Sequence, residues 1–324
     1  MTERLDAFMA RANAAYYATH DPFRDFTTAP EISQGFGELL GLWAAIVWQS
    51  MGAPTPVILA EAGPGRGTLM QDALRAITRM VPQFAAALSV HFIETSPTLR
   101  EAQRSRVPTA TWHDSIETLP PAPLLLLANE FLDALPIRQY VRRAEGWTER
   151  HVANAAFVEI PTPGPTRTAA EGEIIETSDA SHAFITQTAT RIAQHGGAAL
   201  FIDYGPATSA PGDSLQALRH GQPANPLDTP GNADLTAHVD FQALAETART
   251  AGTTPHGPLP QGLFLTRLGL VQRTGALART LPPARADALM QGAHRLIEPD
   301  QMGRLFKALA ITHQALPIPP GFTE

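Results

Sequence analysis

ILAEAGPGRGTLM, residues 58–70, joins a short apolar run to a carboxylate and then to three glycines at alternate positions. The apolar run is typical of a buried parallel strand, and a helical pattern from about Thr68 to Met80 follows it. A glycine-rich turn between a strand and a helix lets a nucleotide-like ligand approach the backbone, because side chains there would block it. The stretch therefore predicts a strand–turn–helix unit that binds a ligand at its turn.

Strand-like apolar runs and helical patterns alternate along much of the chain. Further strands are expected within 88–96, 110–114, 122–130 and 197–205, with helices at 97–106 and 181–197. Such alternation is typical of an α/β fold with an open parallel sheet, in which ligands bind beyond the carboxyl ends of the strands. Each expected strand ends in polar or glycine residues, so these ends are expected to surround one site.

Three segments interrupt the alternation. Residues 1–55 are mostly helical and are interpreted as a cap ahead of a larger domain at 56–324. Residues 137–180 begin with an expected hairpin that turns near Glu145 and Gly146, which predicts a substrate-side insertion. Residues 205–240 begin with a stretch rich in Gly, Pro, Ser and Asn, which indicates a lid-like loop.

The composition excludes several functional classes. Acidic residues outnumber basic ones by 31 to 24, so a nucleic-acid partner is not expected. The absence of cysteine excludes disulfides and thiolate metal sites, and we expect no metal. The only lysine, Lys307, lies outside any P-loop motif and is expected to be a solvated helix residue. No apolar run approaches the ~20 residues of a membrane span, so we expect a soluble protein.

The spacing of Gly63, Gly65 and Gly67 distinguishes between cofactors. The dinucleotide motif Gly-x-Gly-x-x-Gly places its third glycine one residue later than this sequence does. S-adenosylmethionine has no pyrophosphate to bind at the helix N-terminus, and its sulfonium and ammonium groups are cations that nearby carboxylates such as Glu61 stabilise. The pattern therefore favours S-adenosylmethionine over NAD.

Polar strand ends supply the rest of the expected cofactor site. Glu94 can accept hydrogen bonds from both ribose hydroxyls, and Asp114 can accept one from the adenine amino group. The alternative is that these are solvated strand ends beside a tight turn. The expected site consists of Glu61, Gly63, Gly65, Gly67, Thr68, Glu94, Ser96, Asp114, Ser115 and Asn129.

Seven strings of the sequence, spread from about Asp25 to Lys307, resemble the MidA family of class I S-adenosylmethionine-dependent methyltransferases. They are DFTTAPEISQGFGELLGLW, EAGPGRGTLMQDALR, NEFLDALPIRQ, IDYG, GDSLQALRHG, PGNADLTAHVDF and RLIEPDQMGRLFKALA. The resemblance implies a Rossmann-like sheet of seven mostly parallel strands, so 56–324 is expected to be the methyltransferase domain.

The resemblance also implies a protein substrate. The family's mitochondrial member is a respiratory complex I assembly factor that methylates an arginine of the large quinone-side subunit. The implied location is the cytoplasm for a bacterial protein and the mitochondrial matrix for eukaryotic relatives. The resemblance does not fix the oligomeric state, and a homo-oligomer is among the states that it allows.

Acidic residues after the expected fourth strand are candidates for catalysis. Both the guanidinium group and the methyl donor are cations, so bringing them together requires carboxylates beside them. Glu130 and Asp133 are three residues apart and can face one way if a helical turn begins there. Their alternative roles are a polar strand end and a turn ahead of Pro136. Glu130 is the stronger candidate.

Other candidates lie in two further stretches. Thr28 and Glu31 fit a capping box, and Glu31 is equally a candidate for contact with substrate or cofactor. In DLTAHVDF, Asp234 is expected to reach the substrate, and His238 could accept a proton, although a lone histidine is more often structural. Asp240 is expected to cap the helix that follows.

Two rival functions remain from the sequence. An NAD-dependent dehydrogenase would use the same kind of sheet and an acidic residue at Glu94, but it needs the other glycine spacing. A non-catalytic assembly chaperone that binds S-adenosylmethionine would keep the fold without the chemistry, and the acidic pair Glu130 and Asp133 argues against it.

Overall fold

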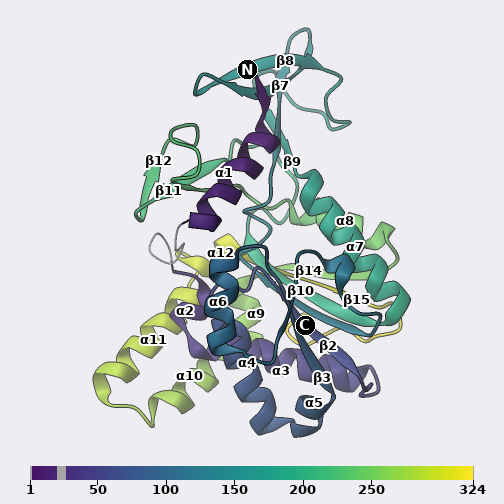
Figure 1. Cartoon of the computed structure of the whole chain (residues 1–324), viewed down its shortest axis with the longest axis vertical. Helices are drawn as coiled ribbons and strands as arrows, with labels where there is room; N and C mark the ends of the chain where they lie inside the picture. The colour runs from purple at the N-terminus through teal and green to yellow at the C-terminus, as the bar shows by residue number, and fades with distance from the viewer. Residues whose placement is uncertain (1, 20–26, 324) are drawn as a thin grey trace.

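A seven-stranded sheet forms the centre of the computed structural model, which describes residues 2–19 and 27–323; Asp25 lies outside them (Figure 1). The strand order is β14-β15-β10-β5-β2-β3-β4. The strands are β2 (Val57–Ala62), β3 (Leu88–Ile93), β4 (Thr111–His113), β5 (Leu124–Asn129), β10 (Gly197–Tyr204), β14 (Thr254–Pro260) and β15 (Phe306–Thr312). Only β15 runs antiparallel to its neighbours within this sheet. The expected sheet of seven mostly parallel strands is confirmed.

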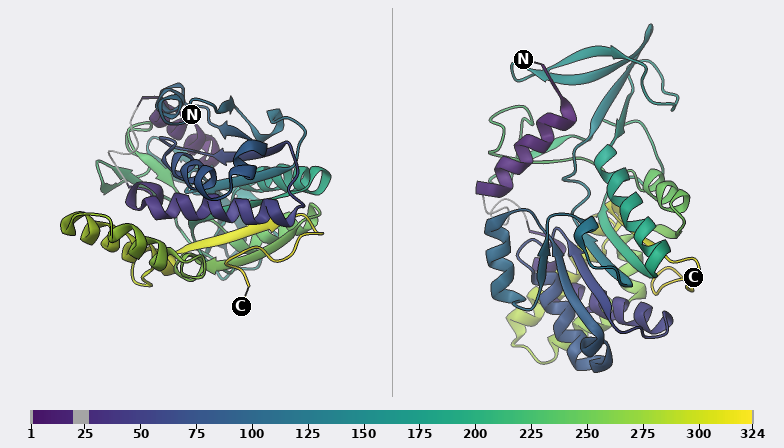
Figure 2. Two further views of the ribbon diagram at one scale, coloured as in Figure 1. Left: turned by 90° about the horizontal axis from the view of Figure 1, so that it is seen from below. Right: turned by 45° about the vertical axis from the view of Figure 1, so that its right-hand side comes forward.

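Helices cover both faces of this sheet (Figure 2). Because side chains alternate along a strand, Leu125 and Leu127 of β5 enter the core on one face, and Leu124 and Leu126 enter the core on the other. One core includes residues of α3 (Gln34–Ser50), α4 (Thr68–Met80), α5 (Pro82–Ala87), α9 (Gln261–Arg267), α10 (Leu270–Ala278), α11 (Pro283–Ile297) and α12 (Met302–Leu305). The other includes residues of α7 (Asp179–His195) and α8 (Phe241–Thr250).

Glycines let α3 lie unusually close to α4. A Cβ atom on Gly41 would lie 2.6 Å from the Cα of Ala73, and one on Gly37 would lie 2.8 Å from the Cβ of Asp72. Such distances leave no room for a side chain, so the two helix backbones are in direct contact. The contact holds α4, the helix that follows the glycine-rich turn, against the sheet.

The expected insertion forms a second sheet. Its strands are β6 (Arg138–Arg143), β7 (Gly146–Ala153), β8 (Ala156–Thr162) and β9 (Ile174–Thr177), and β1 (Glu3–Arg4) pairs with β7. The hairpin joins Arg143 to Gly146, which confirms the expected turn. In Figure 1 β7 and β8 lie at one end of the long axis and α5 at the other.

The N-terminal helix α1 (Leu5–Thr19) packs with the insertion rather than with α3. Its apolar side chains, including Leu5 and Phe8, share a small core with Val152 of β7 and Leu235. Segment 205–240 contributes to this core through a three-stranded sheet of β11 (Gln216–Arg219), β12 (Gln222–Ala224) and β13 (Asp234–Thr236). The described residues among the first 55 therefore lie in two places, and a domain boundary at residue 55 remains our proposal.

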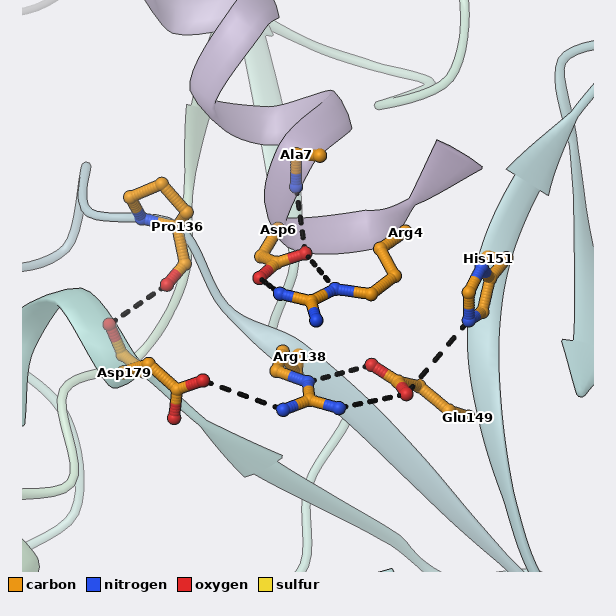
Figure 3. Close-up of polar contacts among 9 residues, drawn as sticks. Arg4, Asp6, Ala7, Pro136, Arg138, Glu149, His151 and Asp179 are labelled. Atoms are coloured by element: carbon orange, nitrogen blue, oxygen red, sulfur yellow. Dashed lines mark hydrogen bonds and ion pairs between the residues drawn. The ribbon is translucent and has the colours of Figure 1, made fainter. Parts of the chain in front are cut away.

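Ion pairs connect the insertion to α7 (Figure 3). The guanidinium of Arg138 donates to both carboxylate oxygens of Glu149, at 2.7 and 2.9 Å, and lies 3.4 Å from Asp179 at the start of α7. Nearby, the Nε of Arg4 at the end of β1 donates to Asp6 of α1 at 2.9 Å. The bidentate contact of Arg138 with Glu149 raises the pKa of Arg138 above its usual value.

Two local expectations have clear outcomes. Asp240 accepts a hydrogen bond from the backbone N–H of Ala243 at 3.1 Å, which confirms it as the cap of α8. The placement of Lys307 on a solvated helix was wrong, because it lies in β15 and is buried between β10 and β14. Within the described ranges, no helix has the length and apolar character needed to cross a bilayer.

Candidate functional site

A cavity of about 690 Å³ lies beyond the carboxyl ends of β2, β3, β4 and β5. α1 and the short helix α2 (Ala29–Ile32) also contribute to its lining. The predicted residues that line it are Glu31, Glu61, Gly63, Gly65, Thr68, Glu94, Ser96, Asp114, Ser115, Asn129 and Glu130. The remaining predicted residues, Gly67, Asp133, Asp234 and His238, lie outside the lining.

The glycine-rich turn adopts a backbone that only glycine tolerates well. The φ angles of Gly63, Gly65 and Gly67 are +62°, +53° and +81°, in the left-handed region. A Cβ atom on Gly63 would also lie 2.8 Å from the ring of Phe131. At Gly63 both the backbone conformation and the available space therefore exclude a side chain, whereas Pro64 and Arg66 of the same turn line the cavity.

Glu61 ends β2 with a buried carboxyl group. It is 3% exposed, and burial raises its pKa to about 8. Its Oε2 atom has no hydrogen-bond partner within the described part of the chain. Because a buried polar atom without a partner is costly, this oxygen is suited to a ligand that brings a cation or a donor.

Glu94 is held at the cavity by neighbours on both of its oxygens. Oε1 accepts from the backbone N–H of Ser96 at 2.7 Å, and Oε2 accepts from the Nε2 of Gln103 at 3.2 Å. Gln103 also donates to the carbonyl of Gly65 at 2.8 Å, so it ties the glycine-rich turn to Glu94. Gln103 is not among the predicted residues, because it lies inside α6 (Pro97–Arg106), where no sequence pattern distinguishes it.

Asp114 follows β4 and is paired with a cation. The guanidinium of Arg100 donates to Asp114 at 2.6 Å and to the backbone carbonyl of Glu94 through Nε at 2.8 Å. Arg100 therefore joins the ends of β3 and β4. Arg100 engages Oδ1 of Asp114, so the second carboxylate oxygen can still accept from a ligand.

Glu130 stands at the end of β5 in a strained conformation. Its φ angle is +51°, and its Oε1 accepts from the backbone N–H of Ala29 at 3.0 Å and from Asn129 at 2.9 Å. Burial raises its pKa. Asn129 has its own Oδ1 atom buried without a partner. Residues other than glycine that adopt a left-handed conformation are concentrated at functional sites. The conformation of Glu130 therefore indicates a functional residue in this cavity.

No helical turn begins at Glu130, whereas residues 132–135 form a turn ahead of Pro136, closed by the backbone N–H of Leu135 donating to Leu132 at 3.2 Å. This is the alternative role of Asp133. The carboxylate of Asp203 accepts hydrogen bonds from the backbone N–H groups of Phe131, Leu132 and Asp133, at 3.1, 2.9 and 3.2 Å. These bonds fold the segment around an anion instead of into a helix. Burial raises the pKa of Asp203 to about 7. Asp203 lies at one of the polar strand ends expected to surround the site, but it holds the cavity wall and does not line the cavity.

Asp133 and Asp234 lie behind the cavity wall. Asp133 is buried, and its pKa is raised well above its usual value by burial and then by the charges of Asp203, Asp234 and Glu130. Asp234 accepts a hydrogen bond from the hydroxyl of Tyr17 at 2.7 Å. Tyr17 lies on α1 and lines the cavity, so it connects Asp234 to the site. Tyr17 is not among the predicted residues, because no motif in the helical N-terminal segment marks it.

Glu31 and His238 have surroundings that differ from those expected. Thr28 precedes α2 but makes no side-chain cap, so the predicted capping box is wrong. Glu31 instead accepts from the hydroxyl of Thr68 at 2.6 Å, and both residues line the cavity. His238 is exposed, stacks edge-on against Tyr204 and lines a separate cavity.

Comparison with known proteins identifies the family. Residues 39–259 match the family model described as "Putative S-adenosyl-L-methionine-dependent methyltransferase". The chain belongs to this family. Its cofactor is therefore S-adenosyl-L-methionine, and the protein is a methyltransferase.

Relatives and a solved structure cover nearly the whole chain. It is 33% identical to the Drosophila melanogaster homolog of protein arginine methyltransferase NDUFAF7, mitochondrial, over 96% of this chain and 80% of that protein. The Homo sapiens NDUFAF7 is 31% identical over 98% of this chain and 80% of its own length. A crystal structure from Burkholderia thailandensis, bound to S-adenosyl-homocysteine, has a TM-score of 0.80 and 26% identity, and covers 99% of this chain and 90% of that one.

The charge of the cavity fits this cofactor. The lining within the described residues carries five acidic side chains, Glu31, Glu61, Glu94, Asp114 and Glu130, and one basic side chain, Arg66. A cofactor with a sulfonium and an ammonium group is attracted to such a surface. The cavity and the Oε2 atom of Glu61, which has no partner among the described residues, provide the space and the acceptor that it needs.

Proposed function

We propose that this methyltransferase methylates an arginine side chain of a protein. The proposal extends to the large quinone-side subunit of respiratory complex I as the substrate, modified during assembly. It is supported by the names of the relatives, which are protein arginine methyltransferases, and by the resemblance of the site strings to the MidA family. The single observation that carries it is the position of Glu130, a strained carboxylate at the end of β5 on the cofactor cavity.

Each group of residues has a role in this proposal. The cofactor would be held by the predicted binding residues, which are Glu61, Gly63, Gly65, Gly67, Thr68, Glu94, Ser96, Asp114, Ser115 and Asn129. When bound, S-adenosylmethionine supplies a methyl group on a positively charged sulfur. Glu130 would contact the guanidinium, offset its charge and orient one nitrogen toward the methyl group.

The other predicted residues act at greater distance in this proposal. Asp133 and Asp234 lie behind the cavity wall, so they would support the site without touching the substrate. Glu31 stands at the mouth with Thr68, where the substrate would enter. His238 lies outside the cofactor cavity, so a catalytic role for it ranks below that of Glu130.

The cellular location follows from the same relatives. They are named as mitochondrial proteins, which supports the matrix for eukaryotic members. For a bacterial source we propose the cytoplasm, where an assembling complex I exposes its peripheral subunits.

The test replaces Glu130 by Gln, which keeps size and hydrogen-bonding reach but removes the anion. We expect single-turnover methylation of the recombinant complex I subunit to fall by about two to three orders of magnitude, as when one preorganised electrostatic group is lost. Cofactor affinity should barely change. Glu101→Gln, an exposed substitution on α6, is the matched control and should methylate at the parent rate.

The outcomes separate catalysis from a chaperone role. Loss of methylation with unchanged cofactor binding would assign Glu130 to the chemistry, because a folding defect would lower both. A methylation rate equal to that of the parent in Glu130→Gln would exclude Glu130 from the chemistry. If neither protein methylates the subunit but both still bind it, a non-catalytic assembly chaperone becomes the better explanation.

A further inference from the structure

A second cavity, of about 580 Å³, lies on the other side of the segment that follows β5. Phe131 lines the cofactor cavity, whereas the next residue, Leu132, lines the second one. The two cavities therefore share the wall that Asp203 holds in place. Residues of the insertion, of segment 205–240 and of β15 complete the lining.

The acidic side chains of this second cavity are already engaged. Among the described residues, its lining contains two carboxylates, Glu176 and Asp240. Glu176 accepts from Gln139 at 2.7 Å and from the backbone N–H of Ser214 at 2.9 Å. Asp240 caps α8 and pairs with Arg167 at 3.1 Å. Neither carboxylate is directed to the remaining basic groups of the cavity.

Lys307, the only lysine of the chain, is one of these basic groups. It is 9% exposed, and its ammonium donates to the backbone carbonyls of Arg304 and Leu305, at 2.5 and 3.0 Å. Among the described residues no carboxylate lies within 4.0 Å of it. A lysine ammonium has three donors, so one proton remains for another acceptor. Burying a charge without a counter-ion is costly, which makes an anionic ligand favourable here.

Arg304 adds a second cation beside Lys307. Arg304 lines the same cavity and is exposed. The burial of Lys307 and then the charge of Arg304 lower the pKa of Lys307. Two neighbouring cations repel each other unless an anion binds between them. A carboxylate fits, because it can accept from an ammonium and a guanidinium at the same time.

We propose that the second cavity binds an acidic side chain of the protein substrate, on Lys307 and Arg304. The proposal rests on the proposed arginine methylation and deepens it. The arginine would enter the acidic cofactor cavity while a nearby glutamate or aspartate of the same protein enters the basic one, on opposite sides of the wall at Phe131 and Leu132. The pair of cavities would thus select arginines that have an acidic neighbour.

The first experiment measures the anion site alone, by thermal unfolding with N-acetylglutamate and with its neutral counterpart N-acetylglutamine. We expect N-acetylglutamate to raise the midpoint of the parent protein. The shift should vanish in Lys307→Met, shrink in Arg304→Gln and stay in the control Arg249→Gln, an exposed residue of α8. Because Arg304 is exposed, we expect Arg304→Gln to fold. This variant therefore still tests the anion site if Lys307→Met does not fold. Equal shifts in the parent and both cavity variants overturn the proposal.

The second experiment decides between a substrate side chain and a free carboxylate. Arginine peptides carry one glutamate, moved through the positions on either side, and each has a glutamine counterpart. We expect the best glutamate peptide to have a kcat/KM about tenfold above its counterpart with the parent, the size of one charge-assisted hydrogen bond. The difference should disappear in Lys307→Met and in Arg304→Gln.

The outcomes distinguish this proposal from the proposed function. If each peptide pair reacts equally while the thermal shift depends on Lys307, the site takes a free carboxylate and the substrate assignment is overturned. If the parent methylates no arginine substrate, the proposed function fails, and with it the assignment to a substrate side chain. The thermal shift then still decides whether the second cavity is an anion site.

Discussion

At the scale of single residues, Glu61 couples cofactor binding to protons. Its pKa in the ligand-free protein is raised to about 8 by burial, so the carboxyl is mostly protonated at pH 7. A folded-state pKa above the ordinary carboxyl value means that this residue's contribution to stability is present at low pH. The contribution is lost as the pH rises through about 8. A bound cation reverses this preference, because it favours the ionised carboxylate.

We therefore predict that cofactor binding at pH 7 releases a proton from Glu61. Calorimetric titration with S-adenosylmethionine in buffers of different ionisation enthalpy measures the number released. Glu61→Gln should lower that number by up to one, while the exposed control Glu101→Gln leaves it unchanged. An identical release in Glu61→Gln and the parent would show that the proton comes from another group, such as Glu94 or Glu130, whose pKa values are also raised.

Single residues differ in how well the sequence indicates them. Gly63, Gly65 and Glu61 belong to one contiguous motif, so local spacing was enough to place them at the cavity. Tyr17 and Asp203 are connected to the site by tertiary contacts. Tyr17 donates to Asp234, and Asp203 accepts from three backbone N–H groups. No periodicity reports such contacts, because they join segments that are far apart in the chain.

At the scale of elements, the contact between α3 and α4 depends on the missing side chain of Gly41. We predict that Gly41→Val lowers the free energy of unfolding by about 3 kcal/mol, since overpacking typically costs ~1–3 kcal/mol and a branched side chain is at the upper end. Urea denaturation measures it. Gly275→Ala in α10 is the control, because nothing lies within 4 Å of its added Cβ, and it should be neutral or stabilising by up to ~1 kcal/mol. Equal midpoints for both variants would contradict the close contact.

Elements with a local signal were the ones that the sequence predicted well. β2 and α4 lie where the apolar run and the helical pattern of residues 56–80 placed them. The stretch GRLFKALA contains good helix formers, yet only its first part is helical, and Lys307 lies in a strand. Pairing with β10 and β14 overrides the helix propensity there, and the sequence of β15 alone does not reveal those partners.

At the scale of the whole molecule, the cofactor should stabilise the fold by mass action. A ligand at 100 times its Kd adds about 2.7 kcal/mol, so S-adenosylhomocysteine should raise the unfolding midpoint of the parent by several degrees. We predict no such shift for Gly65→Val, because its φ angle of +53° and its place in the cavity lining both exclude a branched side chain. Gly275→Ala should keep the parent shift. If Gly65→Val kept the full shift of the unfolding midpoint, the glycine-rich turn would not be part of the cofactor site.

The position of β15 has a consequence for how the chain is made. This strand comes last in the sequence but lies inside the sheet, between β10 and β14. A ribosome releases every other strand of the sheet first, so β10 and β14 wait with open edges until Phe306–Thr312 emerges. Open edges are where strands of other chains attach. A nascent chain stalled or cut before Phe306 is thus a target for aggregation and for holdase chaperones, even though every predicted cofactor-binding residue has already been translated.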